Sequence, residues 1–198
     1  MNKFLRVLFL VFCVLSADVY AHPHIFMDCG AAFVFGADGL EGIRLKWAFD
    51  EFYSETIMLD FDGNKNGFLE EKEVRKVEKE SFSNLKNFHY FTCLSSDGKN
   101  FEVKQVSDFS AVFSSGTVTF EFFIPFKVTS SGKYKEVVVA VYDGTYYTDV
   151  AFLAKDPVVF EKAGGVVCEY AIEADKKFAY YFGEIIPKVI KMKFRKRV

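Results

Sequence analysis

The sequence lacks the residues and motifs that mark several common protein classes. Its 198 residues carry a formal net charge of −2, without the basic excess typical of nucleic-acid-binding proteins. It contains no P-loop, no GxSxG and no HExxH motif. No internal repeat or low-complexity linker divides the chain. We therefore expect a single domain that is not an enzyme and has no nucleic-acid partner.

The apolar run nearest the start of the chain is short. Residues 7–15 are uninterrupted apolar residues that follow a basic start, and this run is too short to span a bilayer. Val19 and Ala21 place small side chains three and one residues before His22, as signal peptidase requires. We expect residues 1–21 to be a cleaved secretory signal peptide, with an uncleaved membrane anchor as the alternative.

Cysteine is also scarce. Of the four cysteines in the chain, Cys29, Cys93 and Cys168 lie beyond the predicted signal. Their number is odd, and none belongs to a CxxC pair or a zinc-like spacing. An exported chain meets an oxidising compartment, so the sequence is compatible with one disulfide and equally with simple buried thiols.

Apolar and aromatic residues, in contrast, are abundant and mostly alternate with polar ones. They make up 51% of the chain and include 25 Phe, too apolar a composition for a disordered protein. Residues 43–49 and 117–126 place apolar side chains on one face of a strand, and turn signals such as SDGK, YDG and AGG separate further strand-like runs. Short strands spaced in this way predict an antiparallel sandwich or an open barrel.

Residues 50–88 break this alternation. Two segments within them, 50–61 and 70–88, are rich in helix formers, and the apolar residues of the second fall near helical spacing. We therefore predict an α+β fold class, with an antiparallel β-sandwich-like domain over residues 22–173 and an EF-hand-type helix–loop–helix inserted at residues 50–88.

The loop between the two helical segments, DGNKNGFLEEKE at residues 62–73, has the pattern of a calcium-binding EF-hand loop. Gly67 at position six permits the sharp turn that the loop requires. Only three predicted ligands are carboxylates, and Lys65 subtracts charge, which predicts weak binding of roughly 10⁻⁴–10⁻³ M. A simple acidic turn is the alternative. The six predicted calcium ligands are Asp62, Asn64, Asn66, Phe68 through its carbonyl, Glu70 and Glu73.

The chain has only three histidines, and two of them, His22 and His24, stand at the predicted start of the mature chain. Cleavage before His22 would leave an α-amine and an imidazole on one residue, which can chelate a transition metal as a histidine brace. On an extended strand His24 points the same way as His22, so both imidazoles can reach one ion. His89 and Asp143 are candidate further ligands, and a pair of solvated histidines is the alternative.

Five segments together resemble one bacterial family: AHPHIFMD, WAFDEFYS, the loop at 62–73, YFTCLSSDGK and AVYDGTYY. This is a family of uncharacterised periplasmic proteins described as components of ABC-type transport systems, and the resemblance spans about residues 21–172. Its members are similar to accessory proteins of zinc uptake and tend to be encoded beside permeases of the nickel/cobalt type. The family pattern YDPTYY has Gly144 here in place of proline, which would loosen that turn.

The resemblance implies a periplasmic protein that captures a divalent transition metal and presents it to an inner-membrane permease. Zinc is the first choice, with nickel, cobalt and copper as others, and His22 and His24 are the implied ligands. Two alternatives remain: a calcium-stabilised secreted binding module without a transition metal, and a histidine-brace copper enzyme. The second would use His89 as the histidine distant in sequence.

The last residues of the chain carry an excess of positive charge. Residues 174–198 hold several Lys and Arg among apolar residues. We expect a basic C-terminal tail that is frayed and solvated, with peripheral contact to anionic lipid headgroups as the alternative.

Overall fold

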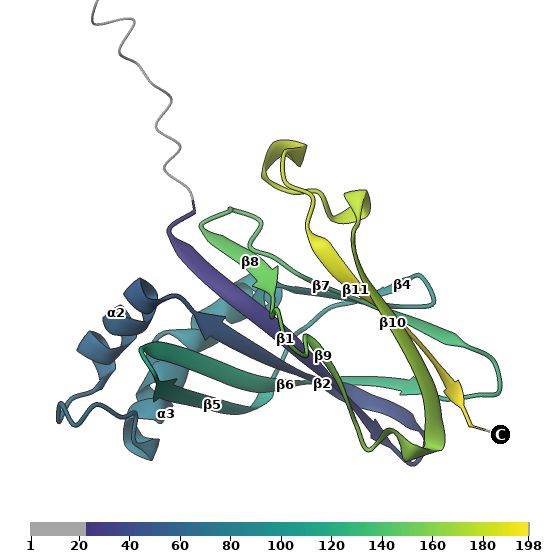
Figure 1. The fold of residues 1–198 in the computed structure, drawn as a ribbon, viewed down its shortest axis with the longest axis horizontal. Helices are drawn as coiled ribbons and strands as arrows, with labels where there is room; N and C mark the ends of the chain where they lie inside the picture. The colour runs from purple at the N-terminus through teal and green to yellow at the C-terminus, as the bar shows by residue number, and fades with distance from the viewer. Residues whose placement is uncertain (1–22, 198) are drawn as a thin grey trace, which may run out of the picture.

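Two β-sheets form most of the fold in the computed structural model, which describes residues 23–197 (Figure 1). The first sheet has the strand order β5-β6-β2-β1-β8, and β9 pairs with β1 beyond the end of β8. The second sheet has the order β10-β11-β7-β3-β4. The strands are β1 (Ile25–Gly36), β2 (Gly39–Phe49), β3 (Thr92–Ser96), β4 (Lys99–Phe101), β5 (Ser107–Ser114), β6 (Thr117–Thr129), β7 (Lys135–Val141), β8 (Thr148–Phe152), β9 (Val158–Glu161), β10 (Val166–Ala174) and β11 (Lys188–Lys196).

The alternation in the sequence places one face of each central strand in a shared core. On β6 every second residue from Val118 to Phe126 is buried, because side chains alternate between the two faces of a strand. The sheets meet through aromatic contacts, among them Phe35 on β1 and Phe194 on β11, whose ring centroids lie 5.2 Å apart. The α+β class predicted from the sequence is confirmed, with two sheets packed across one core.

The first sheet is mixed, whereas the sequence predicted an antiparallel arrangement. β1 pairs antiparallel with β2 but parallel with both β8 and β9. The chain passes from β7 in the second sheet to β8 in the first, and it then runs along β1 in the same direction. Local alternation cannot reveal this, since a residue pattern of period two is the same in parallel and antiparallel pairs.

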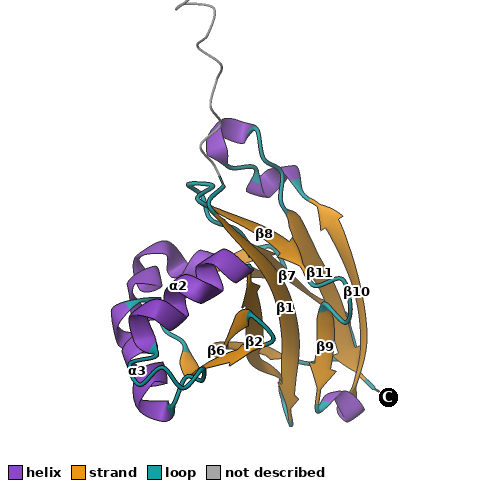
Figure 2. Ribbon diagram, turned by 60° about the vertical axis from the view of Figure 1, so that its left-hand side comes forward, coloured by secondary structure: helices purple, strands orange, loops and turns teal. Residues whose placement is uncertain are grey.

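The helices lie together against one end of the first sheet (Figure 2). α2 (Glu51–Phe61) follows β2 directly and contacts β6, and α3 (Glu71–Glu80) contacts β5. The hydroxyl of Ser54, fully buried, accepts a hydrogen bond of 2.8 Å from the backbone N–H of Val118. Phe82, at the start of the 3₁₀ segment η1 (Phe82–Phe91), is buried against Trp47 and Phe122. The insertion is therefore fastened to the sheet core.

Residues 188–196 form β11, so the structure differs from the expected basic tail. β11 lies between β10 and β7 in the interior of the second sheet, with its apolar residues buried. Two of its lysines form ion pairs across the sheet: Lys191 with Glu173 and Lys193 with Glu136. The alternation of lysine with apolar residues is that of a strand buried on one face, and the basic residues belong to its outer face.

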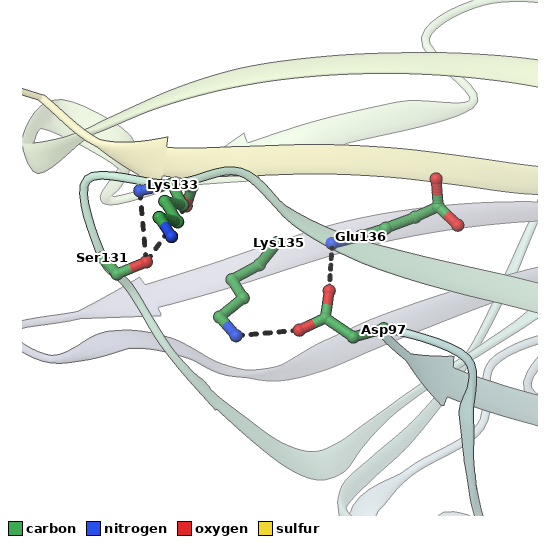
Figure 3. A network of polar contacts seen from close by, with 5 residues as sticks. All are labelled: Asp97, Ser131, Lys133, Lys135 and Glu136. Atoms are coloured by element: carbon green, nitrogen blue, oxygen red, sulfur yellow. Dashed lines mark hydrogen bonds and ion pairs between the residues drawn. The ribbon is translucent and has the colours of Figure 1, made fainter.

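The turn between β3 and β4 is fixed to β7 by one carboxylate (Figure 3). Asp97 accepts a hydrogen bond of 3.0 Å from the backbone N–H of Glu136 and lies 2.8 Å from the Lys135 ammonium. The hydrogen bond from Lys135 has the larger effect, and together with that from Glu136 it holds the pKa of Asp97 below its usual value. In the adjoining β6–β7 turn, Ser131 bonds to the backbone of Lys133. The second sheet thus has an ordered end far from the helices.

No helix in residues 23–197 is long and apolar enough to cross a membrane. The three short 3₁₀ turns η2 (Ala163–Gly165), η3 (Lys176–Phe178) and η4 (Tyr181–Gly183) lie in connections around β10. Two of them, η3 and η4, form the long loop between β10 and β11, which projects from the sheets at the end where β1 begins (Figure 1).

Candidate metal-binding sites

The predicted calcium loop connects α2 and α3, as the sequence indicated. α2 is preceded by its N-cap residue Asp50, whose carboxylate accepts a hydrogen bond of 2.9 Å from the backbone N–H of Tyr53. α3 begins after Glu70, whose own N–H donates to the Glu73 carboxylate at 2.9 Å. A helix–loop–helix is therefore present at this place in the fold, and each helix start is satisfied by a side chain.

Side-chain oxygens of the loop turn inward, toward the backbone of the loop itself. Asp62 accepts hydrogen bonds from the N–H groups of Asn66, at 3.1 Å, and Gly67, at 2.9 Å. Asn64 accepts from Asn66 at 3.0 Å. Glu73 reaches back from α3 and accepts from Gly63 at 2.9 Å. The first, third and last ligand positions of the predicted site thus converge on one short stretch of chain.

The backbone of the loop has the turn that the sequence predicted at position six. Gly67 has a φ of +83°, in the left-handed region that glycine adopts without steric cost, and Lys65 also has a positive φ of +57°. Asn66 accepts a hydrogen bond of 2.9 Å from Phe68, and its amide donates to Glu70 at 3.0 Å. A hard cation that prefers oxygen would meet carboxylate and amide oxygens here, which are among the donors that calcium takes.

His24 lies at the start of β1 on the exposed surface. Its backbone N–H donates to the carbonyl of Tyr147 at 2.9 Å, and its imidazole lies against the Tyr147 ring with the centroids 4.8 Å apart. His22, the other half of the predicted brace, lies outside the described residues. The structure therefore gives the position of one of the two predicted imidazoles, that of His24 against the Tyr147 ring.

Asp143 is buried and its carboxylate is fully engaged by its own loop. One oxygen accepts from the N–H and hydroxyl of Thr145, at 2.9 and 2.7 Å, and the other accepts from the N–H of Thr148 at 3.0 Å. The loop that it shapes ends in Tyr147, on which His24 rests. Asp143 therefore supports the loop that carries Tyr147, and through Tyr147 it supports the position of His24.

His89 belongs to a different neighbourhood. Its Nδ1 lies 3.9 Å from the Glu102 carboxylate, in a depression also lined by Cys93, Tyr142 and Phe178. His89 and the two residues after it have φ values of +51° to +52°, a left-handed run that is rare outside glycine. Within residues 23–197, no three His, Cys, Asp or Glu side chains come together as a metal-binding group.

The three described cysteines are free thiols. Cys29 is buried in the core, and this burial raises the pKa of its thiol to about 12. Burial also raises the pKa of Cys168 to about 11. The Cys93 sulfur lies 3.6 Å from the Tyr142 hydroxyl. Cys29 and Cys168 are therefore poor thiolate ligands, because their raised pKa values keep them protonated near neutral pH.

Sequence reasoning missed an aromatic cluster at the same end of the molecule as His24. Tyr142 stacks on Tyr180 with ring centroids 4.9 Å apart, and Tyr146 lies 5.4 Å from Tyr181. Burial, with the neighbouring Cys93, raises the pKa of Tyr142 to about 12, so its hydroxyl stays protonated. The signal in the sequence is the pairing of two tyrosine-rich stretches, YDGTYY and FAYYF, which lie far apart in the chain.

Comparisons with known proteins place the chain in one family. A family model described as "Protein of unknown function (DUF1007)" matches residues 7–179. An uncharacterised 15.5 kDa protein from the trpE 3′ region of Spirochaeta aurantia is 35% identical over 131 residues, which are 66% of this chain and 93% of that protein. An uncharacterised protein of Haemophilus influenzae is 24% identical over 149 residues, 74% of this chain and 70% of that protein. On this evidence the chain belongs to the DUF1007 family.

Proposed function

We propose that this protein is an exported, periplasmic metal-binding accessory protein without catalytic activity. In this proposal the start of the mature chain captures a divalent transition metal, zinc before nickel, cobalt or copper, and presents it to an inner-membrane permease. An EF-hand-type calcium site in the loop at residues 62–73 stabilises the helical insertion. The proposal is supported most strongly by the inward-turned oxygens of Asp62, Asn64 and Glu73 in that loop.

Calcium would replace the loop's own N–H groups as the partner of these oxygens. Asp62, Asn64, Asn66 and Glu73 would hold it with their side chains, Phe68 with its carbonyl and Glu70 directly or through water. Because Glu73 belongs to α3 and Asp62 directly follows α2, one ion would join the two helices. The ion would supply a structural clamp, with no part in chemistry.

The transition-metal part of the proposal is supported by the ligand chemistry of His22 and His24 and by the position of the His24 ring. Imidazole is a good ligand for zinc, nickel and copper. The ring of His24 is held against Tyr147, and the Tyr147 loop is itself held by the buried Asp143. An imidazole oriented in this way loses less freedom on binding an ion than one on a flexible end.

Isothermal calorimetry of the mature chain tests the calcium site. We expect calcium uptake in the range of roughly 10⁻⁴–10⁻³ M. Glu73→Gln should abolish this uptake, because it removes the carboxylate that closes the site. Glu71→Gln is the matched control, since Glu71 lies in the same turn of α3 and forms an ion pair with Arg75 instead. Absence of calcium uptake by the unaltered protein would contradict this part of the proposal.

Zinc, nickel and copper titrations test the capture site, together with mass spectrometry of the exported protein to locate its first residue. We expect binding that is lost in the double variant His22→Ala/His24→Ala. His89→Ala and Asp143→Asn then decide whether these two candidates belong to the ligand set. Equal binding by the double variant and the unaltered protein would leave the alternative, a calcium-stabilised binding module.

A further inference from the structure

The loop between β10 and β11 carries the most exposed large apolar side chain in the described part of the protein. Phe182 is 96% exposed, whereas other phenylalanines of the chain, such as Phe33 and Phe122, are fully buried in the core. Tyr181 and Phe182 have φ values of +48° and +58°, followed by Gly183 at +86°. Two successive non-glycine residues in the left-handed region are unfavourable. The backbone therefore holds Phe182 outward against both steric and hydrophobic cost.

The loop is ordered, so Phe182 stands on a fixed support. Tyr180 and Ile185 exchange backbone hydrogen bonds of 3.0 and 3.3 Å across the tip. At the base of the loop, the N–H of Asp175 donates to the carbonyl of Pro187 at 3.1 Å. The Tyr180 ring stacks on Tyr142, the residue directly after β7. We call residues 175–187 the aromatic tip.

Exposed lysines lie on the aromatic tip and directly after it. Lys176, Lys177 and Lys188 are exposed, and the ion pairs found here among the described residues join Lys191 to Glu173 and Asp175 without involving these three lysines. Glu184 is the one exposed carboxylate within the tip itself. An exposed phenylalanine with flanking tyrosine and lysine is the composition that binds the interface of an anionic bilayer.

The end of the molecule that carries the tip is also the end at which β1 begins. Tyr146 contacts Tyr181 of the tip, and the next residue, Tyr147, contacts His24. The aromatic tip and the start of β1 are therefore neighbours at one end of the protein.

We propose that the aromatic tip is a membrane-docking element that places Phe182 in the interface of an anionic phospholipid bilayer, with Lys176, Lys177 and Lys188 against the headgroups. One apolar side chain with a few lysines gives weak and reversible attachment. If the proposed metal capture is right, this attachment holds His24 close to the bilayer. Docking itself requires no metal, so it can hold or fail independently of that function.

Sedimentation with vesicles of equal parts phosphatidylglycerol and phosphatidylcholine tests the docking in metal-free buffer. We expect the mature chain to bind these vesicles and to bind pure phosphatidylcholine more weakly. Phe182→Ser should lower the vesicle partition coefficient about tenfold. Tyr134→Ser is the control, because Tyr134 is a half-exposed aromatic at the opposite end of the second sheet and should leave partitioning unchanged.

Fluorescence gives a second measurement that does not depend on the strength of sedimentation. Trp47, the single tryptophan, is buried and provides a constant background. Emission of Phe182→Trp should shift to shorter wavelength with anionic vesicles and be quenched by brominated lipid, whereas Tyr134→Trp should do neither. Equal partitioning of Phe182→Ser and the unaltered chain, equal binding to neutral vesicles, or an unshifted Phe182→Trp spectrum would each overturn the proposal.

Discussion

Two connecting segments of this protein use their side chains in opposite ways. The loop at residues 62–73 turns its carboxylates and amides inward, where Asp62 and Glu73 accept backbone hydrogen bonds. The aromatic tip at residues 175–187 turns Phe182 outward into solvent. Polar groups are stabilised by hydrogen bonds to partners within the protein. A large exposed apolar side chain can be stabilised only when another molecule buries it. This difference underlies the two proposals, a calcium ion in the first loop and a membrane surface at the aromatic tip.

The strongest test of this contrast compares the same substitution at two phenylalanines. Phe82, which fastens the helical insertion, is buried among Trp47, Phe109 and Phe122, so Phe82→Ala should lower the free energy of unfolding by about 3–5 kcal/mol. Phe182→Ala should change it by less than about 0.5 kcal/mol. Urea denaturation followed by Trp47 fluorescence measures both, and a comparable loss at Phe182 would show that the tip supports the fold.

The second test compares one carboxylate from each segment. Glu73 accepts hydrogen bonds from Gly63 and Glu70, so Glu73→Ala should cost about 1–2 kcal/mol of unfolding free energy even in the presence of a chelator. Glu184 is exposed at the tip, and Glu184→Ala should stay within about 0.5 kcal/mol of the unaltered protein. Thermal unfolding in EDTA measures this difference. Equal losses of stability in the two variants would show that the hydrogen bonds of Glu73 do not stabilise the fold.

The smallest expected effect concerns pH at the base of the tip. The backbone N–H of Lys177, and then the Lys191 ammonium, hold the pKa of Asp175 below its usual value of 3.8. Its contribution to stability is therefore complete above pH 3.8 and is lost as the pH falls through the lowered pKa of the folded state. Asp175→Asn should lower the melting temperature slightly at pH 7, and the difference should vanish in strong acid. A carboxyl titration by NMR checks the direction of the pKa change.

Local patterns explain why much of the fold was predictable. The alternation around Phe120 and Phe122, the first helical segment and the Gly67 turn all depend on residues close in sequence, and each appears in the structure. The second helical segment, predicted over residues 70–88, is α-helical only over Glu71–Glu80 and continues as the 3₁₀ segment η1. Residues 174–198 were misjudged as a tail because their basic residues drew more weight than their alternation. Residues 188–196 within it form a central strand, since Ile190 and Met192 complete the core of the second sheet.

The candidate sites also differ in whether their residues are close or distant in the sequence. The calcium loop is contiguous, so its ligands were predicted from spacing alone, while calcium binding itself stays a prediction. The surroundings of His24 could not be predicted, because Tyr147 and the supporting Asp143 are more than a hundred residues away in the chain. The predicted association with transport and metal uptake likewise awaits the experiments above.

By itself, the sequence determined the class of the fold, the place of its helical insertion and the order of oxygen donors in the loop at residues 62–73. These depend on interactions between near neighbours, whose geometry the backbone sets. Only the tertiary structure decided the parallel pairing of β1 with β8 and β9, the central place of β11 and the meeting of His24 with the tyrosines. Such contacts depend on which distant segments bury apolar surface together, and no local pattern encodes that choice.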